Sequence, residues 1–223
     1  MATIFSKNVL FIHVQKNGGT SVSKYLMQVL PRPVFYLRPE PYAWLNDDRA
    51  VHIPGHPHIS MNRAKSLLQS NGFSLKNIPI VLAVMRNPYD RAVSLYSFYR
   101  RTELEKNSSS VKRLAWKLDF REFILEATSN PAYDFMSGFY ACFHLGKVKP
   151  RNLRIIKYEH LEDEVKSVMA ELNIRSNIQF PWLNQSQRGE YESYYDAQTE
   201  EAVYFKNRWV FDEGFYTRMW VDV

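Results

Sequence analysis

The chain has 223 residues, which suits one domain of ordinary size with a sizeable hydrophobic core. Its hydrophobic fraction of 45% and charged fraction of 23% exclude a disordered chain, and no apolar run reaches membrane-spanning length. The formal net charge of +6 at pH 7 first suggests nucleic acid, but the basic residues are scattered rather than gathered in one stripe. Because a site for a ligand with several negative charges also accounts for the excess, we expect no nucleic-acid partner.

The chain contains a single cysteine, Cys142, so it forms no internal disulfide and no cysteine cluster for a metal. Its first residues lack the charged and then apolar pattern of a signal peptide. A free thiol without an export signal is typical of a reducing cytoplasm. We therefore expect a cytoplasmic protein that does not bind a membrane.

The first motif lies near the start of the chain. Residues 9–14 form an apolar run that predicts a buried parallel strand, and residues 22–30 repeat apolar side chains at helical spacing. Between them lies the glycine loop, residues 16–21 (Lys-Asn-Gly-Gly-Thr-Ser). Glycines let the backbone approach a phosphate, and the free N–H groups of a first helical turn point at it. The pattern predicts a phosphate-binding loop.

The order of residues in the glycine loop excludes the commonest phosphate loops. A Walker loop places its lysine after the last glycine, whereas Lys16 precedes both glycines here. The dinucleotide pattern G-x-G-x-x-G is also missing. The alternative is a glycine turn between strand and helix that binds no ligand.

A second strand delivers a cation to the same edge of the predicted sheet. Residues 80–85 are another buried-strand run, and Arg86 follows directly. Asn87 is placed to cap the next helix and Pro88 to begin it. A nucleotide hydrolase would more naturally offer an acid for Mg²⁺ here, whereas an arginine suits a second phosphate without metal. Ser94, two helical turns along, is placed to face the same ligand.

These two motifs together resemble the cofactor signatures of the sulfotransferases that use 3′-phosphoadenosine-5′-phosphosulfate (PAPS). The form Ile-His-Val-Gln-Lys at residues 12–16 is most similar to the branch that includes carbohydrate sulfotransferases. Weaker likenesses follow at residues 154–161 and 184–188. The resemblance implies an α/β fold over residues 1–223. The implied fold is a single three-layer sulfotransferase domain, similar to P-loop nucleotide-binding folds, with a short central parallel sheet flanked by helices.

The resemblance also implies roles for particular residues. The glycine loop would hold the 5′-phosphosulfate, and Lys16 would neutralise charge on the leaving oxygen. Arg86 and Ser94 would hold the 3′-phosphate, with Arg188 as a second partner for it. The expected cofactor-binding residues are Lys16, Asn17, Gly18, Gly19, Thr20, Ser21, Arg86, Ser94 and Arg188. No metal is expected, because phosphoadenosine phosphate (PAP) is already a good leaving group.

A histidine-rich loop offers a base for the acceptor. Residues 51–58 contain three histidines between prolines and a glycine, a loop that does not impose the geometry of a metal site. Histidine is the natural base near neutral pH. Some relatives in the carbohydrate branch use a histidine from a Gly-His loop at about this position, and His56 matches it best. His52 and His58 are the other candidates, and surface histidines without chemistry are the alternative.

The rest of the chain predicts ordinary α/β elements. Residues 100–113 are polar and charged, either a surface loop or a lid over the acceptor site. The predicted strands cover residues 34–37 and 153–157, and the predicted helices cover 63–69, 119–128, 161–172 and 196–209.

These features favour transfer of a sulfuryl group from PAPS to a hydroxyl acceptor. A carbohydrate acceptor is slightly favoured over a lipid, a peptide tyrosine or a small alcohol. Lys16 and His56 are the expected catalytic residues. A kinase or nucleotide hydrolase on a related fold is one alternative. A phosphonucleotide- or polyanion-binding protein without catalysis is another. The oligomeric state is left open.

Overall fold

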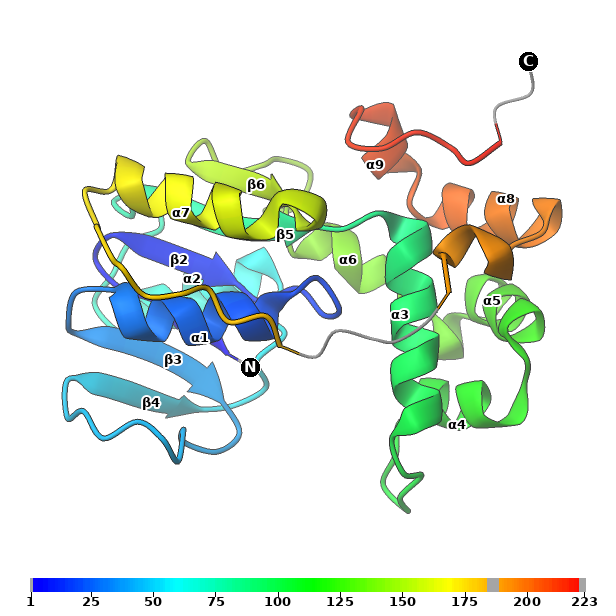
Figure 1. The fold of residues 1–223 in the computed structure, drawn as a ribbon, viewed down its shortest axis with the longest axis horizontal. Coiled ribbons are helices and arrows are strands. Elements are labelled where there is room, and N and C mark those ends of the chain that lie inside the picture. Colours follow the sequence, from blue (N-terminus) through cyan, green and yellow to red (C-terminus); the bar gives the residue numbers. More distant parts are fainter. Residues whose placement is uncertain (1, 184–188, 221–223) are drawn as a thin grey trace. The chain divides into compact units, whose positions relative to one another are not determined.

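The computed structural model describes residues 2–183 and 189–220, drawn as coloured ribbons in Figure 1. The chain separates into two compact units: residues 1–85 with 141–184, and residues 86–140 with 185–223. Each unit has its own elements and core, and the two are described in turn. The single domain predicted over residues 1–223 stays a prediction.

The first unit is built on a six-stranded sheet with the strand order β4-β3-β1-β2-β5-β6. The strands are β1 (Thr3–Phe5), β2 (Val9–Ile12), β3 (Val34–Arg38), β4 (Ala50–Pro54), β5 (Ile80–Met85) and β6 (Leu153–Lys157). The pairs β2–β5, β5–β6 and β3–β4 are parallel, whereas β1 runs antiparallel to both of its neighbours. The predicted α/β class is confirmed, but the sheet is mixed because the short strand β1 inserts between β2 and β3.

Helices cover both faces of this sheet. In Figure 1, α1 (Gly19–Val29) and α7 (Leu161–Glu171) lie on the near face and α2 (Met61–Ser70) on the far face. Alternate residues of β2 point to opposite faces, so Val9 and Phe11 join α1 and α7 in one hydrophobic core. All four residues of β2 are buried, which explains the continuous apolar run in the sequence. The first unit therefore has the three layers that the resemblance implied.

The second unit is helical. Its elements are α3 (Pro88–Arg101), α4 (Ser110–Lys117), α5 (Phe120–Ser129), η1 (Pro131–Tyr133), η3 (Tyr191–Tyr194), α8 (Ala197–Lys206) and α9 (Arg208–Asp212). A short helix, α6 (Ser137–Ala141), spans the boundary in the sequence between the two units. The core of the second unit is rich in aromatic side chains from α3, α5 and the segment around Tyr195.

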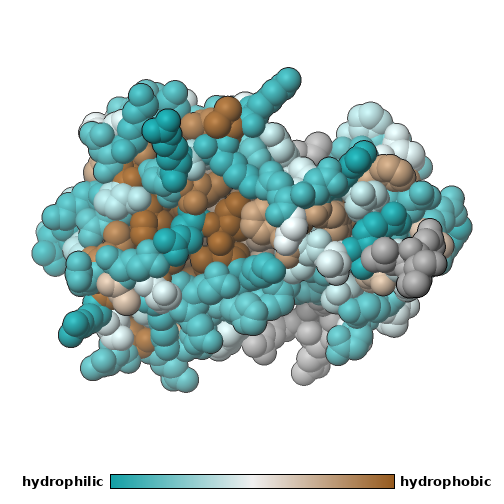
Figure 2. Space-filling model, turned by 90° about the horizontal axis from the view of Figure 1, so that it is seen from above, coloured by the Kyte–Doolittle hydropathy of each residue, from teal (hydrophilic) through white to brown (hydrophobic). Residues whose placement is uncertain are grey.

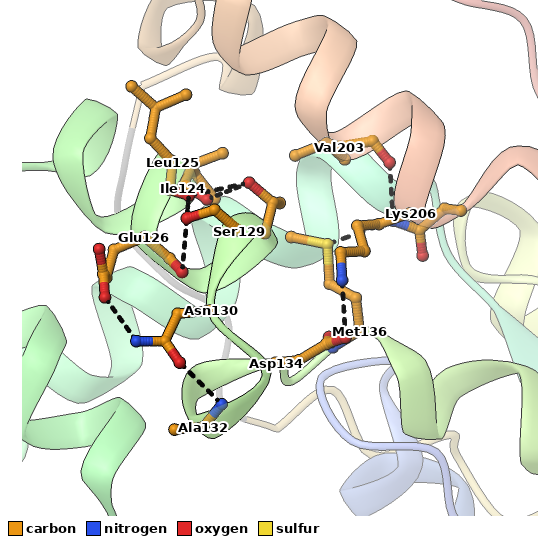
Figure 3. A network of polar contacts seen from close by, with 12 residues as sticks. Ile124, Leu125, Glu126, Ser129, Asn130, Ala132, Asp134, Met136, Val203 and Lys206 are labelled. Atoms are coloured by element: carbon orange, nitrogen blue, oxygen red, sulfur yellow. Dashed lines mark hydrogen bonds and ion pairs between the residues drawn. The ribbon is translucent and has the colours of Figure 1, made fainter.

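Polar side chains at the helix ends complete this second unit (Figure 3). Asn130 donates to the Glu126 carboxylate and accepts from the amide of Ala132, which closes the end of α5 onto η1. Lys206, at the end of α8, forms an ion pair of 3.0 Å with Asp134. These contacts satisfy the backbone and charged groups that a helix end leaves without partners.

Two predicted segments, the loop 100–113 and the helix 196–209, differ from the structure. The polar segment 100–113 is only in part a loop, because α3 continues to Arg101 and α4 begins at Ser110. The predicted helix 196–209 is broken into α8 and α9 at Asn207. The buried Asn207 side chain donates to the carbonyl of Val203, and its backbone leaves the helical conformation (φ −118°, ψ 20°).

The surface drawn in Figure 2 is mostly hydrophilic, with hydrophobic residues visible between hydrophilic ones. Among the helices that the structure describes, none is long and apolar enough to cross a bilayer.

Candidate functional site

The glycine loop joins β2 to α1 through two left-handed residues. Lys16 has φ +66° and Gly18 has φ +74°, so the chain reverses within three residues and enters the helix at Gly19. No side chain caps this helix terminus. The first N–H groups of a helix lack partners inside it and carry partial positive charge, so an uncapped terminus suits an anion. The conformation that the sequence predicted for a phosphate-binding loop, a tight turn into a helix terminus, is therefore present, and phosphate binding stays a prediction.

Neighbouring side chains leave no space for a Cβ atom at either glycine of the loop. A Cβ on Gly19 would lie 1.8 Å from Cδ2 of His13, and a Cβ on Gly18 would lie 2.7 Å from Cδ2 of Leu161 and 3.0 Å from Cε2 of Tyr158. The loop thus rests on the imidazole of His13 on one side and on the turn that follows β6 on the other. Tyr158 and Leu161 belong to residues 154–161, which resemble a segment of the sulfotransferases in sequence. In the structure these two side chains support the glycine loop.

The polar side chains of the glycine loop divide into two groups. Asn17 is fully buried, and its Nδ2 donates to the carbonyl of Val84 on β5 at 2.6 Å. The buried hydroxyl of Ser21 accepts from the amide of Leu183 at 3.0 Å. Lys16 and Thr20 are only half-buried. The loop therefore uses Asn17 and Ser21 to hold its own shape, and Lys16 and Thr20 lie nearer the solvent.

In the second unit, Arg86 and Ser94 lie together. Arg86 is only 7% exposed, and its Nε donates to Asp90 Oδ2 at 2.6 Å. Its Nη1 donates to the Ser94 hydroxyl at 3.2 Å. Asn87 caps α3 as predicted, accepting from the amide of Tyr89 at 3.0 Å. The capped helix start thus fixes an arginine, a serine and a carboxylate in one small group.

Residues 55–59, here called the histidine loop, follow β4 and run along the carboxyl edge of the sheet. The amide of Gly55 donates to the carbonyl of Arg38 at the end of β3, at 3.1 Å. The hydroxyl of Thr3 donates to the carbonyl of Pro57 at 2.8 Å. Nδ1 of His58 lies 3.0 Å from the carbonyl oxygen of His13, which follows β2. The histidine loop therefore reaches from β4 across β3 and β1 to His13, which lies between β2 and the glycine loop.

The histidines of this edge have different environments. His58 packs against His13, with ring centroids 4.5 Å apart, and against His56, with centroids 5.2 Å apart. His52 lies earlier, within β4, with Nε2 2.9 Å from the carbonyl of Arg38. Of the three predicted candidates, His56 and His58 lie in the histidine loop and His52 does not.

His13 is a residue that the sequence did not single out. It is 1% exposed, and its Nδ1 has no hydrogen-bond partner among the residues that the structure describes. Burial, and then the neighbouring His58, hold the pKa of His13 well below its usual value, so this imidazole is neutral. A neutral ring between the glycine loop and His58 adds no charge to either. The contact of His13 with Gly19 is what suggests a role for this residue. The spacing of residues along the sequence does not predict that contact.

Comparison with known proteins follows this geometry. A model of the sulfotransferase family matches residues 4–213. The chain belongs to the sulfotransferase family. Among curated protein sequences, none matches this chain.

Solved sulfotransferase structures have the same fold. Mouse sulfotransferase SULT7A1, complexed with PAP, is 14% identical with a TM-score of 0.54, covering 92% of this chain and 85% of that one. A sulfotransferase from Alicyclobacillus acidocaldarius is 16% identical with a TM-score of 0.50, covering 89% of this chain and 90% of that one. Family and fold together support sulfuryl transfer as the activity of this sulfotransferase.

Arg188, the remaining predicted residue of the site, lies outside the described residues. Two further residues of the candidate site were not predicted from the sequence in these roles: Thr3, which holds the histidine loop, and Asp90 as the partner of Arg86. The i, i+4 spacing of Arg86 and Asp90 was a signal for the second, because such pairs meet on a helix surface.

Proposed function

We propose that this protein transfers a sulfuryl group from PAPS to a hydroxyl group of its acceptor by in-line displacement with a histidine base. The acceptor oxygen attacks sulfur, and the bond from sulfur to the oxygen of the 5′-phosphate breaks. PAP leaves with the electron pair, and the histidine takes the acceptor proton. The observation that carries this proposal is the contact of the histidine loop with His13, the residue under the glycine loop.

The glycine loop is the proposed site for the 5′-phosphosulfate. Backbone N–H groups from Gly18 to Thr20 and the hydroxyl of Thr20 would bind its oxygens, whereas the amide of Ser21 donates to the carbonyl of Gly18 at 3.0 Å. Lys16 would neutralise the negative charge that grows on the bridging oxygen, an electrostatic effect that acts in the transition state. Asn17 and Ser21 would contribute by holding the loop, because their side chains bond to Val84 and Leu183.

Arg86 and Ser94 form the proposed site for the 3′-phosphate. An arginine and a hydroxyl 3.2 Å apart offer two donors to one phosphate. Asp90 fixes the orientation of the guanidinium through Nε. A nucleotide without the 3′-phosphate would leave this group of donors without its ligand, which costs binding energy.

The geometry favours His58 as the base over His56. A carbonyl oxygen only accepts, so Nδ1 of His58 must carry the proton beside the His13 carbonyl, and Nε2 has the lone pair. Nδ1 of His56 lies 3.3 Å from the amide nitrogen of His58 and 3.2 Å from its carbonyl oxygen, so this contact fixes no single tautomer. We therefore propose His58 first and His56 second.

The test is incubation with PAPS and a panel of hydroxyl acceptors, with sulfated product measured by mass. Lys16→Ala and Arg86→Ala should each abolish product. Affinities for PAP and for ATP with Mg²⁺ distinguish the proposed function from the kinase alternative. Tight binding of ATP with Mg²⁺ and no binding of PAP would favour the kinase. Binding of PAP without turnover of any acceptor would favour the protein without catalysis.

A further inference from the structure

The direction of strand β1 places Thr3 beside the candidate site. Because β1 runs antiparallel to both of its neighbours, its first residue lies at the edge where those strands end. Thr3 pairs with Leu37, the last residue but one of β3, and Ile4 pairs with Phe11, the last but one of β2. The mixed sheet thus carries Thr3 to the same edge as the glycine loop and the histidine loop.

The hydroxyl of Thr3 forms a hydrogen bond to each of two segments of the site. It accepts from the amide of His13 at 3.2 Å and donates to the carbonyl of Pro57 at 2.8 Å. An amide only donates and a carbonyl only accepts, so the direction of both bonds is determined. Pro57 is the residue between His56 and His58. One hydroxyl therefore joins the histidine loop to the backbone that leads into the glycine loop.

The imidazole of His58 contacts the same backbone. The carbonyl oxygen of His13 lies 3.0 Å from Nδ1 of His58, while the amide of His13 donates to Thr3. The bond from Thr3 to Pro57 holds the backbone directly before His58, and the bond to His13 holds its ring. Together they close a ring of contacts through Thr3, Pro57, His58 and His13. This ring of contacts fixes both the position and the tautomer of His58.

Thr3 is itself held firmly in place. It is fully buried, and the amide of the preceding residue, Ala2, donates to the hydroxyl of Ser23 on α1 at 3.2 Å. That hydroxyl also donates to the carbonyl of Gly19 at 2.6 Å, in the first turn of the same helix. The start of β1 is therefore bonded to the helix that follows the glycine loop. A base supported in this way keeps its alignment with the donor when the acceptor binds.

We infer that Thr3 is a positioning residue: its hydroxyl holds the histidine loop so that His58 is aligned with a sulfuryl donor in the glycine loop. This inference rests on the proposed sulfuryl transfer with His58 as the base. Thr3 touches neither donor nor acceptor and acts only through Pro57 and His13. A side chain that merely filled space between the strands could be valine, which has the same branched shape without the hydroxyl.

The test compares variants at two buried threonines. Thr3→Val removes both hydrogen bonds, and Thr3→Ser keeps them. Thr3→Ala also lacks the hydroxyl and is measured beside Thr3→Val, so a variant that fails to fold does not end the test. The matched control is Thr199→Val. Thr199 is fully buried, and its hydroxyl also accepts from a backbone amide and donates to a backbone carbonyl, both of Asp196 in the other unit.

The first measurement requires no acceptor. Nitrogen NMR of the histidine rings at about pH 8, where an ordinary imidazole is neutral, gives the tautomer of His58. The wild type, Thr3→Ser and Thr199→Val should show the form protonated on Nδ1, because the His13 carbonyl accepts from it. Thr3→Val and Thr3→Ala should show a mixture of both tautomers.

The second measurement is sulfation of two phenols with PAPS as donor. The hydroxyl of 4-methylphenol is protonated at pH 7 and needs a base, whereas pentafluorophenol is already ionised and needs none. Thr3→Val should lower kcat for 4-methylphenol by about 10–100-fold, because a small displacement of a catalytic group has effects of this size. Its kcat for pentafluorophenol and its KM for PAPS should change little. Thr3→Ser should recover most of the lost rate, and Thr199→Val should lose stability without this selective effect.

Two outcomes overturn the role of Thr3. They are an unchanged His58 tautomer in the variants without the hydroxyl, or equal losses of rate with both phenols. If the wild type sulfates no hydroxyl acceptor, the tautomer alone decides: its dependence on Thr3 would preserve the positioning role while the proposed function fails. If both phenols are sulfated and Thr3→Val behaves like the wild type, the proposed function stands and the role of Thr3 fails.

Discussion

Nδ1 of His58 lies 3.0 Å from the carbonyl oxygen of His13, which joins the histidine loop to the residue under the glycine loop. If His58 is the base, His58→Ala should lower kcat by about 10²–10⁴-fold, the usual contribution of general-base catalysis. Affinity for PAP, measured by calorimetry, should not change, because the side chain does not belong to the glycine loop. His56→Ala is the matched comparison and should cost less. Full activity of His58→Ala would contradict the assignment.

Gly19→Ala should destabilise the protein and remove PAP binding. The new Cβ would lie 1.8 Å from Cδ2 of His13, and His13 is buried, so the loop or the ring must move. Overpacking of this kind costs about 1–3 kcal/mol or more. The control is Gly138→Ala, where no atom lies within 4 Å of the added Cβ. Thermal unfolding and PAP titration of the two variants check the result, and equal behaviour would show that the packing under Gly19 is unimportant.

Ser94→Ala tests the proposed 3′-phosphate site with little disturbance. Loss of one hydrogen bond of about 0.5–1.5 kcal/mol predicts about two- to tenfold weaker binding of PAP. Binding of adenosine 5′-phosphosulfate, which has no 3′-phosphate, should stay the same. Ser97→Ala, on the same helix α3, is the control. Equal weakening of both ligands would mean that Ser94 acts on the fold rather than on the 3′-phosphate.

Arg218→Met should lower stability, because Glu200 would lose the ion pair that holds it. Glu200 is 1% exposed; Arg218 Nη2 lies 2.5 Å from its Oε2, and the Tyr89 hydroxyl also donates to it. An unpaired buried carboxylate costs about 1–3 kcal/mol or more. Arg208→Met is the control, because its ion pair with Asp212 is exposed and such pairs contribute about 0–1 kcal/mol. Denaturant unfolding of the two variants should show a clear difference, and equal losses would refute it.

Asp196 makes the protein sensitive to acid. Bonds from the backbone and hydroxyl of Thr199, and then from Arg121, lower the pKa of this carboxyl to about 2 from an ordinary 3.8. Because the folded-state pKa is depressed, its stabilisation is complete above about pH 4 and is lost as the pH falls towards 2.

Asp196→Ala should therefore lower stability at pH 7 by about 1 kcal/mol through the lost cap of α8. The variant should also lose less stability than the wild type between pH 4 and 2, the window set by these two pKa values. Thermal unfolding across that pH range checks both. A variant with the acid sensitivity of the wild type would show that Asp196 does not titrate in this way.

Local sequence patterns predicted most of the elements. The predicted strands at 80–85 and 153–157 match β5 and β6. Short apolar runs between turns usually adopt the conformation of a buried strand. The predicted helix 119–128 also matches α5 to within one residue at each end, since Asp119 and Glu122 form a capping box from local contacts alone. The antiparallel strand β1 was missed, because a strand of three residues carries too little periodicity to be recognised.

The candidate site likewise contains features that the sequence predicted and features that it did not. The glycine loop and the Arg86–Ser94 pair could be predicted from the sequence, because their chemistry follows from residues close together in the chain. The position of His13 was not, because it depends on contacts with Gly19 and His58 from distant segments. The choice between His56 and His58 also required the carbonyl of His13, which is 45 positions away along the chain.

The sequence by itself determined the family-specific loops and most of the strands and helices, because backbone conformation at glycines, caps and apolar runs is set by near neighbours. Only the tertiary structure decided which imidazole faces the glycine loop and which side chains of that loop turn inward. Those outcomes depend on how strand ends meet at the edge of the sheet, and packing between distant segments has no signature in a single sequence.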